Sequence, residues 1–472
     1  MKTFLILLEK ELRETFHSTR FLITFSLSTI LILLTFYTGI RSYTLSKERH
    51  EADVKAVLKK YEGYTDWRLI SGHQVQIPPT FLSALVMGVS NDIGQQITVQ
   101  ASGELSSTNS YFSQNPIYAV FKALDLSFLF QVILSLVAIV FAFNSVCGEK
   151  ENATLALIFS GSIPRATFIL SKVIGAYLSL TLPLVIPFLL SFILIEVLSV
   201  SLTLEEWLKL LGIIGLGFLY LGVFITLSVA VSTFTVRSAN SFSILLSLWV
   251  IMVIVLPKAS IMLAGRAVEV PNLDAISKEK SQYSRQLWSE TQKRMSEFKS
   301  PNDTNPETAM KKFNEFMSKE SEEREVKFSA LAKRLNEERS NREKVRESLA
   351  INIAKVSPSA VFAISAATLA ETDISLKNLF HENAANYQKV FGEFQYSKTG
   401  VKQGGGFRMF FSQQGNAPPK PIDVSELPVF QFKGKDLAAL FQEVFVDGVL
   451  LLLFSILLTA IAFKRFLNYD LR

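Results

Sequence analysis

The chain has 472 residues, of which 49% are hydrophobic and 38 are phenylalanine, so its composition is too apolar for a soluble protein of this length. The net charge of +6 matches the basic excess that membrane proteins carry in cytoplasmic loops, and it gives no reason to expect nucleic acid as a partner. The single cysteine, Cys147, excludes an intramolecular disulfide, and the four histidines are scattered without metal-ligand spacing.

The first twenty residues are predicted to form an amphipathic helix in the inner membrane interface. Leu5, Leu8, Leu12 and Phe16 recur on one face, and charged side chains occupy the other. A simple membrane anchor has the same pattern, so the two interpretations are compatible.

Six apolar runs follow, with lengths near those that a helix needs to cross a bilayer. The first contains no charge and ends without a small-residue cleavage site, so we interpret it as a retained span and not as a signal peptide. Pro257 is expected to break the fifth helix just past its end. The predicted spans are residues 21–40, 126–146, 173–195, 210–232, 240–256 and 444–463.

Lysines and arginines near the span ends predict the orientation. With six spans, they gather at the N-terminus, between the second and third spans, between the fourth and fifth, and in the tail at 464–472. Both termini are therefore expected in the cytoplasm. The two long polar segments, 41–125 and 257–443, are expected outside.

The larger outside segment has the pattern of a long antiparallel helical hairpin. Residues 274–299 and 307–356 carry spaced apolar side chains among dense charges, and the turn signal at 300–306 separates them. Solvated helices with many ion pairs are the alternative to a packed hairpin. A large, mainly helical extracytoplasmic domain is expected in either case.

Two shorter apolar runs, at 77–88 and 356–372, are too short to span a bilayer. They are expected to lie in the outer interface or to pack on the spans, with a core helix of the outer domain as the competing interpretation. Ser357 is expected to cap a helix that has Pro358 at its first position. The remainder of the segment is predicted to be loop, with a short strand at 429–432.

The segment at 147–172, between the second and third spans, is longer and more patterned than a turn requires. Glu149 and Glu151 stand at a predicted helix N-terminus, where carboxylates are favoured. The next apolar residues recur at i, i+3 and i+4, which predicts a short helix with an exposed apolar edge. These residues are Leu155, Ile158 and Phe159. A docking site for a cytosolic partner explains this pattern.

The order of interfacial helix, span, outside segment, span and a cytosolic E-x-E-x-x-T-L…P-R…K loop resembles the export-type (type 2) ABC transporter permease family. It is similar in particular to permeases with a large insert between the fifth and sixth spans. The family commonly has Gly-Thr where this chain has Ala153-Thr154. The matching residues are Glu149, Glu151, Thr154, Leu155, Pro164, Arg165 and Lys172.

The resemblance implies an all-α integral membrane protein with six spans that serves as the permease subunit of an ABC transporter. In that family the loop is the coupling helix that seats in a groove of the ATPase subunit, so the loop residues named above are expected to contact it. The resemblance also implies two ATPase copies, a dimer with itself or a sister permease, and a bacterial inner membrane. No G-x-x-x-x-G-K-[ST] pattern occurs, so ATP and magnesium are expected on the partner.

Two functions remain open, and the chain itself is expected to be neither an enzyme nor a metal or cofactor protein. In the first, ATP hydrolysis is coupled to export of an amphipathic or hydrophobic substrate, because polar residues within the spans are few. In the second, the chain is a mechanical transmitter that moves the outer hairpin against an envelope protein without moving cargo. Pro183 and Pro187 in the third span are candidate hinges, with static kinks as the alternative.

Overall fold

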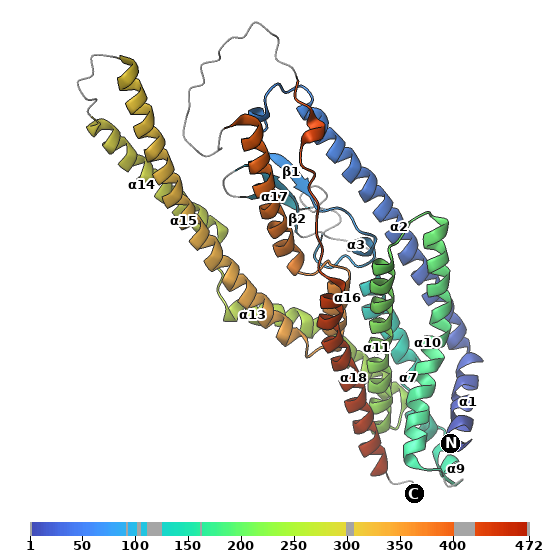
Figure 1. Ribbon diagram of the computed structural model, residues 1–472. Coiled ribbons are helices and arrows are strands. Elements are labelled where there is room, and N and C mark those ends of the chain that lie inside the picture. Colours follow the sequence, from blue (N-terminus) through green and yellow to red (C-terminus); the bar gives the residue numbers. More distant parts are fainter. Residues whose placement is uncertain are drawn as a thin grey trace.

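The computed structural model describes residues 2–90, 93–101, 105–110, 125–160, 163–298, 306–400 and 421–469. Figure 1 shows an elongated, mainly helical molecule in which long helices run side by side and both chain ends lie at the same end. We call this the terminal end and the opposite one the distal end. The short helix α1 (Lys2–Phe16) lies at the terminal end, before the first long helix.

Among the described residues, six helices are long and apolar enough to cross a membrane. The protein is thus the mainly helical integral membrane protein that the sequence predicts. Four spans are single helices: α2 (Thr19–Tyr61), α10 (Arg165–Val197), α11 (Leu204–Phe234) and α18 (Leu437–Leu467). The second span consists of α6 (Leu126–Phe128), the π-helical turn η2 (Leu129–Leu134), α7 (Ser135–Ala142) and α8 (Cys147–Glu151). The fifth consists of α12 (Ser238–Val250), the π-helical turn η3 (Ile251–Val255) and α13 (Leu256–Ala267).

The first span does not end where its apolar run ends. Helix α2 continues from residue 40 to Tyr61 as a polar helix that reaches the distal part of the molecule. Residues 41–61 contain neither glycine nor proline, so nothing in the local sequence stops the helix. Hydropathy therefore predicts where the apolar surface of the helix ends, whereas the end of the helix itself depends on residues that interrupt the helical backbone.

The break expected at Pro257 is wrong. Helix α13 begins at Leu256 and continues to Ala267, with the proline in its first turn. The π-helical turn η3 directly precedes it. A proline lacks the N–H that an α-helix needs at that position, and the wider turn upstream accommodates both the missing bond and the ring.

Two short helices fill the distal end of the span bundle. Helix α3 (Phe81–Leu85) and helix α16 (Pro358–Leu369) belong to the same hydrophobic core as the spans. The prediction that both apolar runs pack on the spans is confirmed. Ser357 accepts a hydrogen bond from the amide of Ala360, so the predicted cap of α16 is also confirmed.

The distal part contains a small antiparallel sheet that the sequence did not predict. Its strands are β1 (His73–Gln76), β2 (Gly94–Val99) and β3 (Ser106–Ser110), in the order β1-β2-β3. His73 lies opposite Val99, and Gly94 lies opposite Ser110. Strands of four to six residues give too few alternations for a periodic signal in the sequence.

A second hydrophobic core lies between this sheet and helix α17 (Ser375–Thr399). The 3-10 turns η1 (Trp67–Leu69) and η4 (Val424–Glu426) contribute Trp67 and Val424 to it. The strand predicted at 429–432 is wrong, because this segment forms no ladder and instead packs Phe430 and Phe432 against the core.

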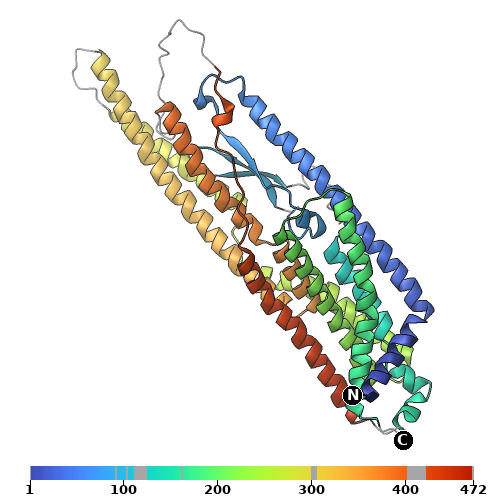
Figure 2. The same ribbon diagram turned by 45° about the vertical axis from the view of Figure 1, so that its right-hand side comes forward.

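The predicted hairpin is formed by α14 (Leu273–Glu297) and α15 (Pro306–Ala354), which pack side by side and slant away from the spans (Figures 1 and 2). The turn predicted at 300–306 lies mostly outside the described residues. Charged contacts join the helices: Arg324 lies 3.8 Å from the Trp288 ring centroid, and Arg294 pairs with Glu320 at 3.0 Å. The hairpin thus combines packing with ion pairs.

Candidate functional site

The candidate site is the loop between the second and third spans, at the terminal end. It contains α8 and a second short helix, α9 (Thr154–Ser160), and it leads into α10 at Arg165. Ala153 joins the two short helices with a φ of 57°, a left-handed conformation that favours glycine. The turn therefore requires a backbone conformation that glycine adopts most easily. The permease family that the sequence resembles commonly has glycine at this position.

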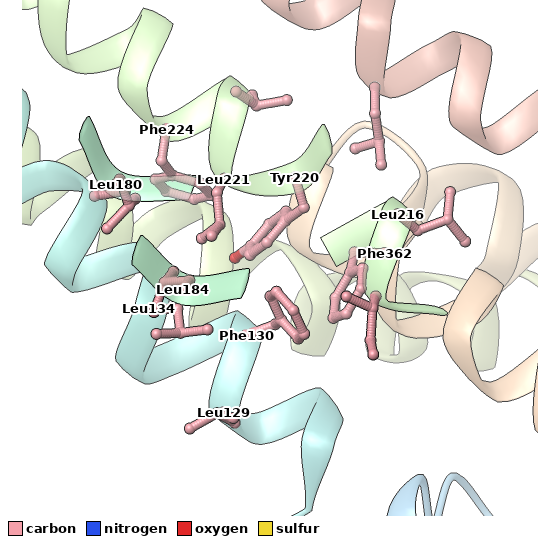
Figure 3. Close-up of a cluster of buried hydrophobic side chains, with 14 of the residues drawn as sticks. Leu129, Phe130, Leu134, Leu180, Leu184, Leu216, Tyr220, Leu221, Phe224 and Phe362 are labelled. Carbon is pink, nitrogen blue, oxygen red and sulfur yellow. The ribbon is translucent and has the colours of Figure 1, made fainter. Parts of the chain in front are cut away.

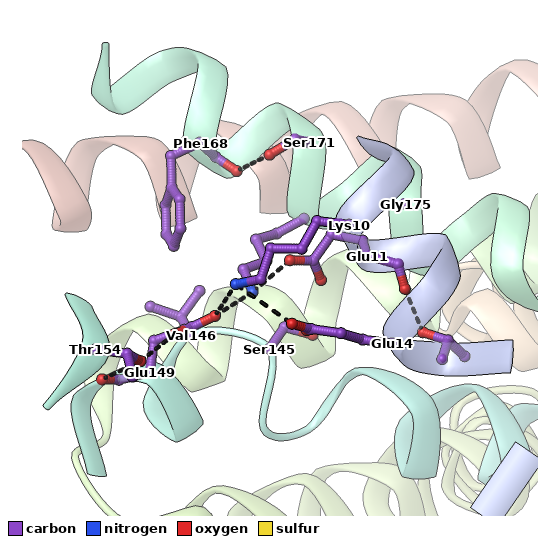
Figure 4. A network of polar contacts seen from close by, with 12 residues as sticks. Lys10, Glu11, Glu14, Ser145, Val146, Glu149, Thr154, Phe168, Ser171 and Gly175 are labelled. Carbon is purple, nitrogen blue, oxygen red and sulfur yellow. Dashed lines mark hydrogen bonds and ion pairs between the residues drawn. The ribbon is translucent and has the colours of Figure 1, made fainter. Parts of the chain in front are cut away.

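Glu149 is the centre of a polar network that joins this loop to two long-range neighbours (Figure 4). Its Oε1 accepts hydrogen bonds from Lys172 Nζ of α10 at 3.1 Å and from Lys10 Nζ of α1 at 3.2 Å. The Thr154 hydroxyl, at the start of α9, donates to Oε2. Lys172 also pairs with Glu11 of α1 at 2.7 Å.

The network is largely removed from solvent, since the side chain of Lys172 is only 5% exposed. Burial raises the pKa of Glu11, although the ammonium of Lys172 opposes the shift. Burial lowers the pKa of Lys10, but the carboxylates of Glu149, Glu14 and Glu11 together outweigh that effect and raise the pKa above its ordinary value. Buried charges of this kind depend on each other, because removing one leaves the others without compensation.

The next two charges of the loop bind the facing ends of α11 and α12. Lys150 Nζ donates to the carbonyl oxygens of Thr233 at 2.6 Å and Thr235 at 3.0 Å, at the C-terminus of α11. The Glu151 carboxylate accepts from the Ser238 amide at 2.9 Å and from its hydroxyl at 2.6 Å, at the N-terminus of α12. Each charge therefore has the sign that its helix end favours.

Two further contacts complete the attachment of the loop. The Arg165 guanidinium donates to the carbonyl oxygens of Phe466, at 3.3 Å, and Leu467, at the C-terminus of α18. The hydroxyl of Ser232 in α11 accepts from the amides of Val146, at 3.0 Å, and Cys147, at 2.8 Å. Polar contacts thus run from the loop to α1, α10, α11, α12 and α18.

Comparison with known families identifies the family of the chain. The model of the family described as ABC-2 family transporter protein matches residues 5–317, more than half of the chain. The chain belongs to the ABC-2 transporter family. A comparison with curated proteins gives no match. Membership identifies a membrane permease that works with an ATP-binding partner.

The residues predicted to form an exposed apolar edge on the loop of this ABC-2 transporter protein are not the exposed ones, so that prediction is wrong. Leu155 is 4% exposed, and Ile158 and Phe159 pack against the core of the bundle. The ring of Phe159 lies 5.3 Å from that of Phe168. The stripe at i, i+3 and i+4 therefore faces the bundle, since an apolar stripe on a short helix follows the nearest core. Leu157, on the opposite side, is 74% exposed.

The apolar face predicted for α1 of the ABC-2 protein is divided between two surroundings. Leu8 and Glu11 lie against α10, where a Cβ added to Gly175 would come within 2.8 Å of the Glu11 Cβ. Leu5 is 57% exposed and Phe16 is also exposed, while Leu12 is partly buried. The helix is consequently fixed to α10 along one side and presents apolar side chains on another.

The two prolines of the third span do not interrupt it. Helix α10 runs without a break from Arg165 to Val197, and Pro183 and Pro187 both lie inside it. A hinge at these positions stays a prediction. Pro164 immediately precedes the helix in an extended conformation, as expected for a residue at a helix start.

Several residues of the site were not recognised from the sequence of this ABC-2 protein. From the sequence, Lys10 and Lys150 count only among the lysines and arginines that indicate orientation, and Ser232 and Leu157 have no predicted role. The run Glu149-Lys150-Glu151 was the available signal, because alternating charges between two spans suit helix ends of opposite polarity. Among the residues that the structure describes, no group of three or more His, Cys, Asp and Glu side chains is placed to hold a metal ion.

Proposed function

We propose that the chain is the permease subunit of an ATP-driven exporter and that the α8–α9 loop is its coupling helix. The observation that carries the proposal is the attachment of the loop to five helices through Glu149, Lys150, Glu151 and Arg165. A push on the loop would act on all of these helices together. Such an attachment suits a part that transmits force and exceeds what a turn needs.

Leu157 is proposed as the residue that inserts into the ATP-binding subunit. Its side chain is exposed, while Phe159 holds the opposite side of the same helix against the bundle. A large apolar side chain at a protein surface contributes to binding when a partner pocket removes it from water. The rigid backing supplied by Phe159 would preserve its orientation.

The proposal includes a topology and an assembly. The terminal end, with both chain termini, would lie in the cytoplasm of a bacterial cell, and the distal end would lie outside the inner membrane. Lysines and arginines at the terminal ends of the spans support this orientation. Two ATP-binding subunits would carry ATP and magnesium, and the permease would pair with itself or with a sister subunit. The chain itself would catalyse no reaction.

The proposed substrate is amphipathic or hydrophobic. Within the spans, the described polar side chains are mainly hydroxyls that bond to carbonyls of their own helix, such as Ser179, Ser191 and Ser228. Chains of intramembrane carboxylates, which proton-coupled transport requires, are not evident in the sequence. A path lined by apolar and aromatic groups suits lipid-like or peptide cargo.

A mechanical transmitter is the second candidate, and one observation favours it. The hairpin begins where the fifth span ends, at α13, and it returns into the bundle through α16. Movement of the spans would therefore act on both ends of the hairpin. In this version an envelope protein would receive the movement, and no cargo would cross the bilayer.

The test is co-purification of the tagged protein from its native host in mild detergent, with partners identified by mass spectrometry. We expect an ATP-binding subunit at about one copy per permease with the wild-type protein and its loss with Leu157→Asp. Leu204→Asp is the matched control, because this leucine is similarly exposed but lies at the other end of the span bundle, in the first turn of α11, where an acidic side chain is favoured. Retention of the ATPase by Leu157→Asp would contradict the proposed docking residue, and no ATPase with wild type would contradict the function itself.

A further inference from the structure

Two spans depart from α-helical geometry, the second near its distal end and the fifth near its middle. The second span contains the π-helical turn η2, and the fifth contains the π-helical turn η3. Such turns are rare, they are less regular than an α-helix, and they change the course of backbone hydrogen bonds. A π-helical turn therefore persists best where other groups of the protein satisfy its backbone and pack against it.

The turn η2 receives its support from α11 and α16. The carbonyl oxygen of Gln131, inside η2, accepts a hydrogen bond from the Tyr220 hydroxyl of α11 at 3.1 Å. The amide group of its side chain donates to the carbonyl oxygen of Ser359, in the first turn of α16, at 2.9 Å. Phe130 packs beside it, and a Cβ at Gly217 would overlap its ring.

The turn η3 receives its support from the same end of α16. The Ser357 hydroxyl, which caps α16, also donates to the carbonyl oxygen of Met252 inside η3. Trp249, just before η3, donates from Nε1 to the hydroxyl of Ser135 at 2.8 Å, and Ser135 directly follows η2. The two π-helical turns are thus joined through α16 and through a hydrogen bond between residues that flank them.

Aromatic packing reinforces this arrangement, as Figure 3 shows. Phe362 of α16 packs against both Tyr220 and Phe130, with ring centroids 5.1 Å and 5.4 Å away. All three side chains are fully buried. Any displacement of α16 would therefore disturb contacts to α11 and η2 together.

The base of the hairpin enters the same region. Lys355, directly after the last residue of α15, pairs with Asp447 of α18 at 2.6 Å. Ser365 of α16 donates to the other oxygen of that carboxylate at 3.0 Å. Asp447 is 3% exposed, so these two contacts replace water around its carboxylate.

We propose that the first turn of α16, with Ser357 and Ser359, is a mechanical junction that holds the π-helical turns of the second and fifth spans and couples them to the base of the hairpin. A shift of either span toward regular α-helix would break its bond to α16 and move the end of α15. This junction operates whether the molecule exports cargo or moves a partner, and it does not depend on the identity of the ATPase.

Hydrogen exchange of the full-length protein in lipid nanodiscs tests the coupling. Gln131→Met keeps the side-chain volume but removes the donor to Ser359. We expect amide exchange to accelerate about fivefold in η2, as for the loss of one hydrogen bond, and also in η3 and in residues 351–357, which Gln131 does not bond. By the reciprocity of coupled sites, Ser357→Ala should accelerate exchange in η2 as well as in η3.

Two further variants separate coupling from simple damage. Ser357→Thr retains both the cap and the hydroxyl donor, so it should restore slow exchange at both turns. Ser348→Ala is the matched control in α15, because this exposed serine bonds only to the carbonyl of Val345 in its own helix, and it should change nothing at either turn. Faster exchange that is confined to the mutated helix, or equal for Ser357→Thr and Ser357→Ala, would overturn the proposal.

Discussion

The two ends of the span bundle are held together by different chemistry. At the terminal end, the α8–α9 loop uses ionised side chains against one another and against helix ends, as with Glu149, Lys150 and Glu151. At the distal end, α16 uses mainly hydroxyl, amide and aromatic groups inside the bundle, as with Ser357 and Gln131. Charges are tolerated where spans end and water is close, whereas neutral groups cost less among apolar helices.

The difference also concerns what each end can do. An ion network at helix ends couples several helices to one surface loop, which suits an input from a partner. Neutral bonds to π-helical turns couple the spans to one another and to the hairpin, which suits a response within the membrane protein. The predictions below vary one end at a time, beginning with the largest expected effect.

Removing the central cation of the terminal network should have the largest effect. Lys172→Met leaves the carboxylates of Glu149 and Glu11 buried without their closest cation. We expect a loss of stability of about 3–5 kcal/mol, seen as a lower unfolding temperature in detergent. Glu14→Gln, which removes the exposed pair of Lys10 with Glu14, should cost less than about 1 kcal/mol. Equal effects of the two variants would mean that the network is not stabilising through its buried charges.

The inner side of α9 should be the next most sensitive position. Phe159→Asp removes ring contacts with Phe168 and Phe466 and places a charge against the core. We expect a loss of about 3 kcal/mol and faster proteolysis of the loop. Leu157→Asp, two residues away on the exposed side, should change stability by less than about 0.5 kcal/mol. Comparable stability of both variants would contradict the orientation of α9.

The distal core should respond to pH through His73. This side chain packs between Tyr387 and Phe391, and burial lowers its pKa from 6.5 to about 4. The unfolded segment therefore binds a proton more readily, and the stability that is present above pH 7 falls as the pH is lowered toward 4. At pH 5.5 the loss should be about 1–2 kcal/mol.

Hydrogen exchange in β1 and β2, corrected for the intrinsic rate, measures this loss. In His73→Phe, the stability measured by this exchange should vary less between pH 7.5 and pH 5.5 than in the wild-type protein. His17→Gln at the terminal end should leave it in place, because His17 is exposed and distant from the sheet. An unchanged slope in His73→Phe would assign the pH response to other groups.

Much of the membrane part could be predicted from the sequence, and the reasons are physical. Apolar runs must satisfy their backbones as helices, so the six spans were identifiable, and Ser357-Pro358 gave the start of α16. The π-helical turns could not be predicted, because they depend on backbone contacts made after folding. The continuation of α2 was missed for another reason, since the predicted end of the span followed hydropathy and not the absence of glycine and proline beyond residue 40. The strands β1 to β3 were not predicted, because they are too short to show the alternation of apolar and polar residues that indicates a strand.

The orientation of the candidate site could not be predicted from the sequence. The loop at 147–172 was identified from its charges, yet the i, i+3, i+4 pattern could not distinguish a stripe facing a partner from one facing the protein's own core. Only the contact of Phe159 with Phe168 and Phe466 decides between them. The ends of α11, α12 and α18 that receive Lys150, Glu151 and Arg165 are distant in sequence, so their proximity had no local signal.

The smallest predicted effect concerns the turn between α8 and α9. Ala153 has a φ of 57°, and this conformation costs an L-residue about 1–2 kcal/mol relative to glycine. Ala153→Gly removes that strain but gives the unfolded chain more freedom, which costs about 0.5–1 kcal/mol. We expect a net stabilisation of up to about 1 kcal/mol, with ATPase co-purification retained.

Ala156→Gly is the matched control, because Ala156 is exposed and lies inside the helical part of α9. There a glycine should destabilise by about 0.5–1 kcal/mol, because no strain is relieved and only the freedom of the unfolded chain increases. If Ala153→Gly stabilises the protein and Ala156→Gly destabilises it, the left-handed conformation belongs to the turn and not to the helix that follows it. Destabilisation by both variants would mean that the left-handed turn is not the conformation that the loop adopts, and the direction in which α9 leaves α8 would have to be reassigned.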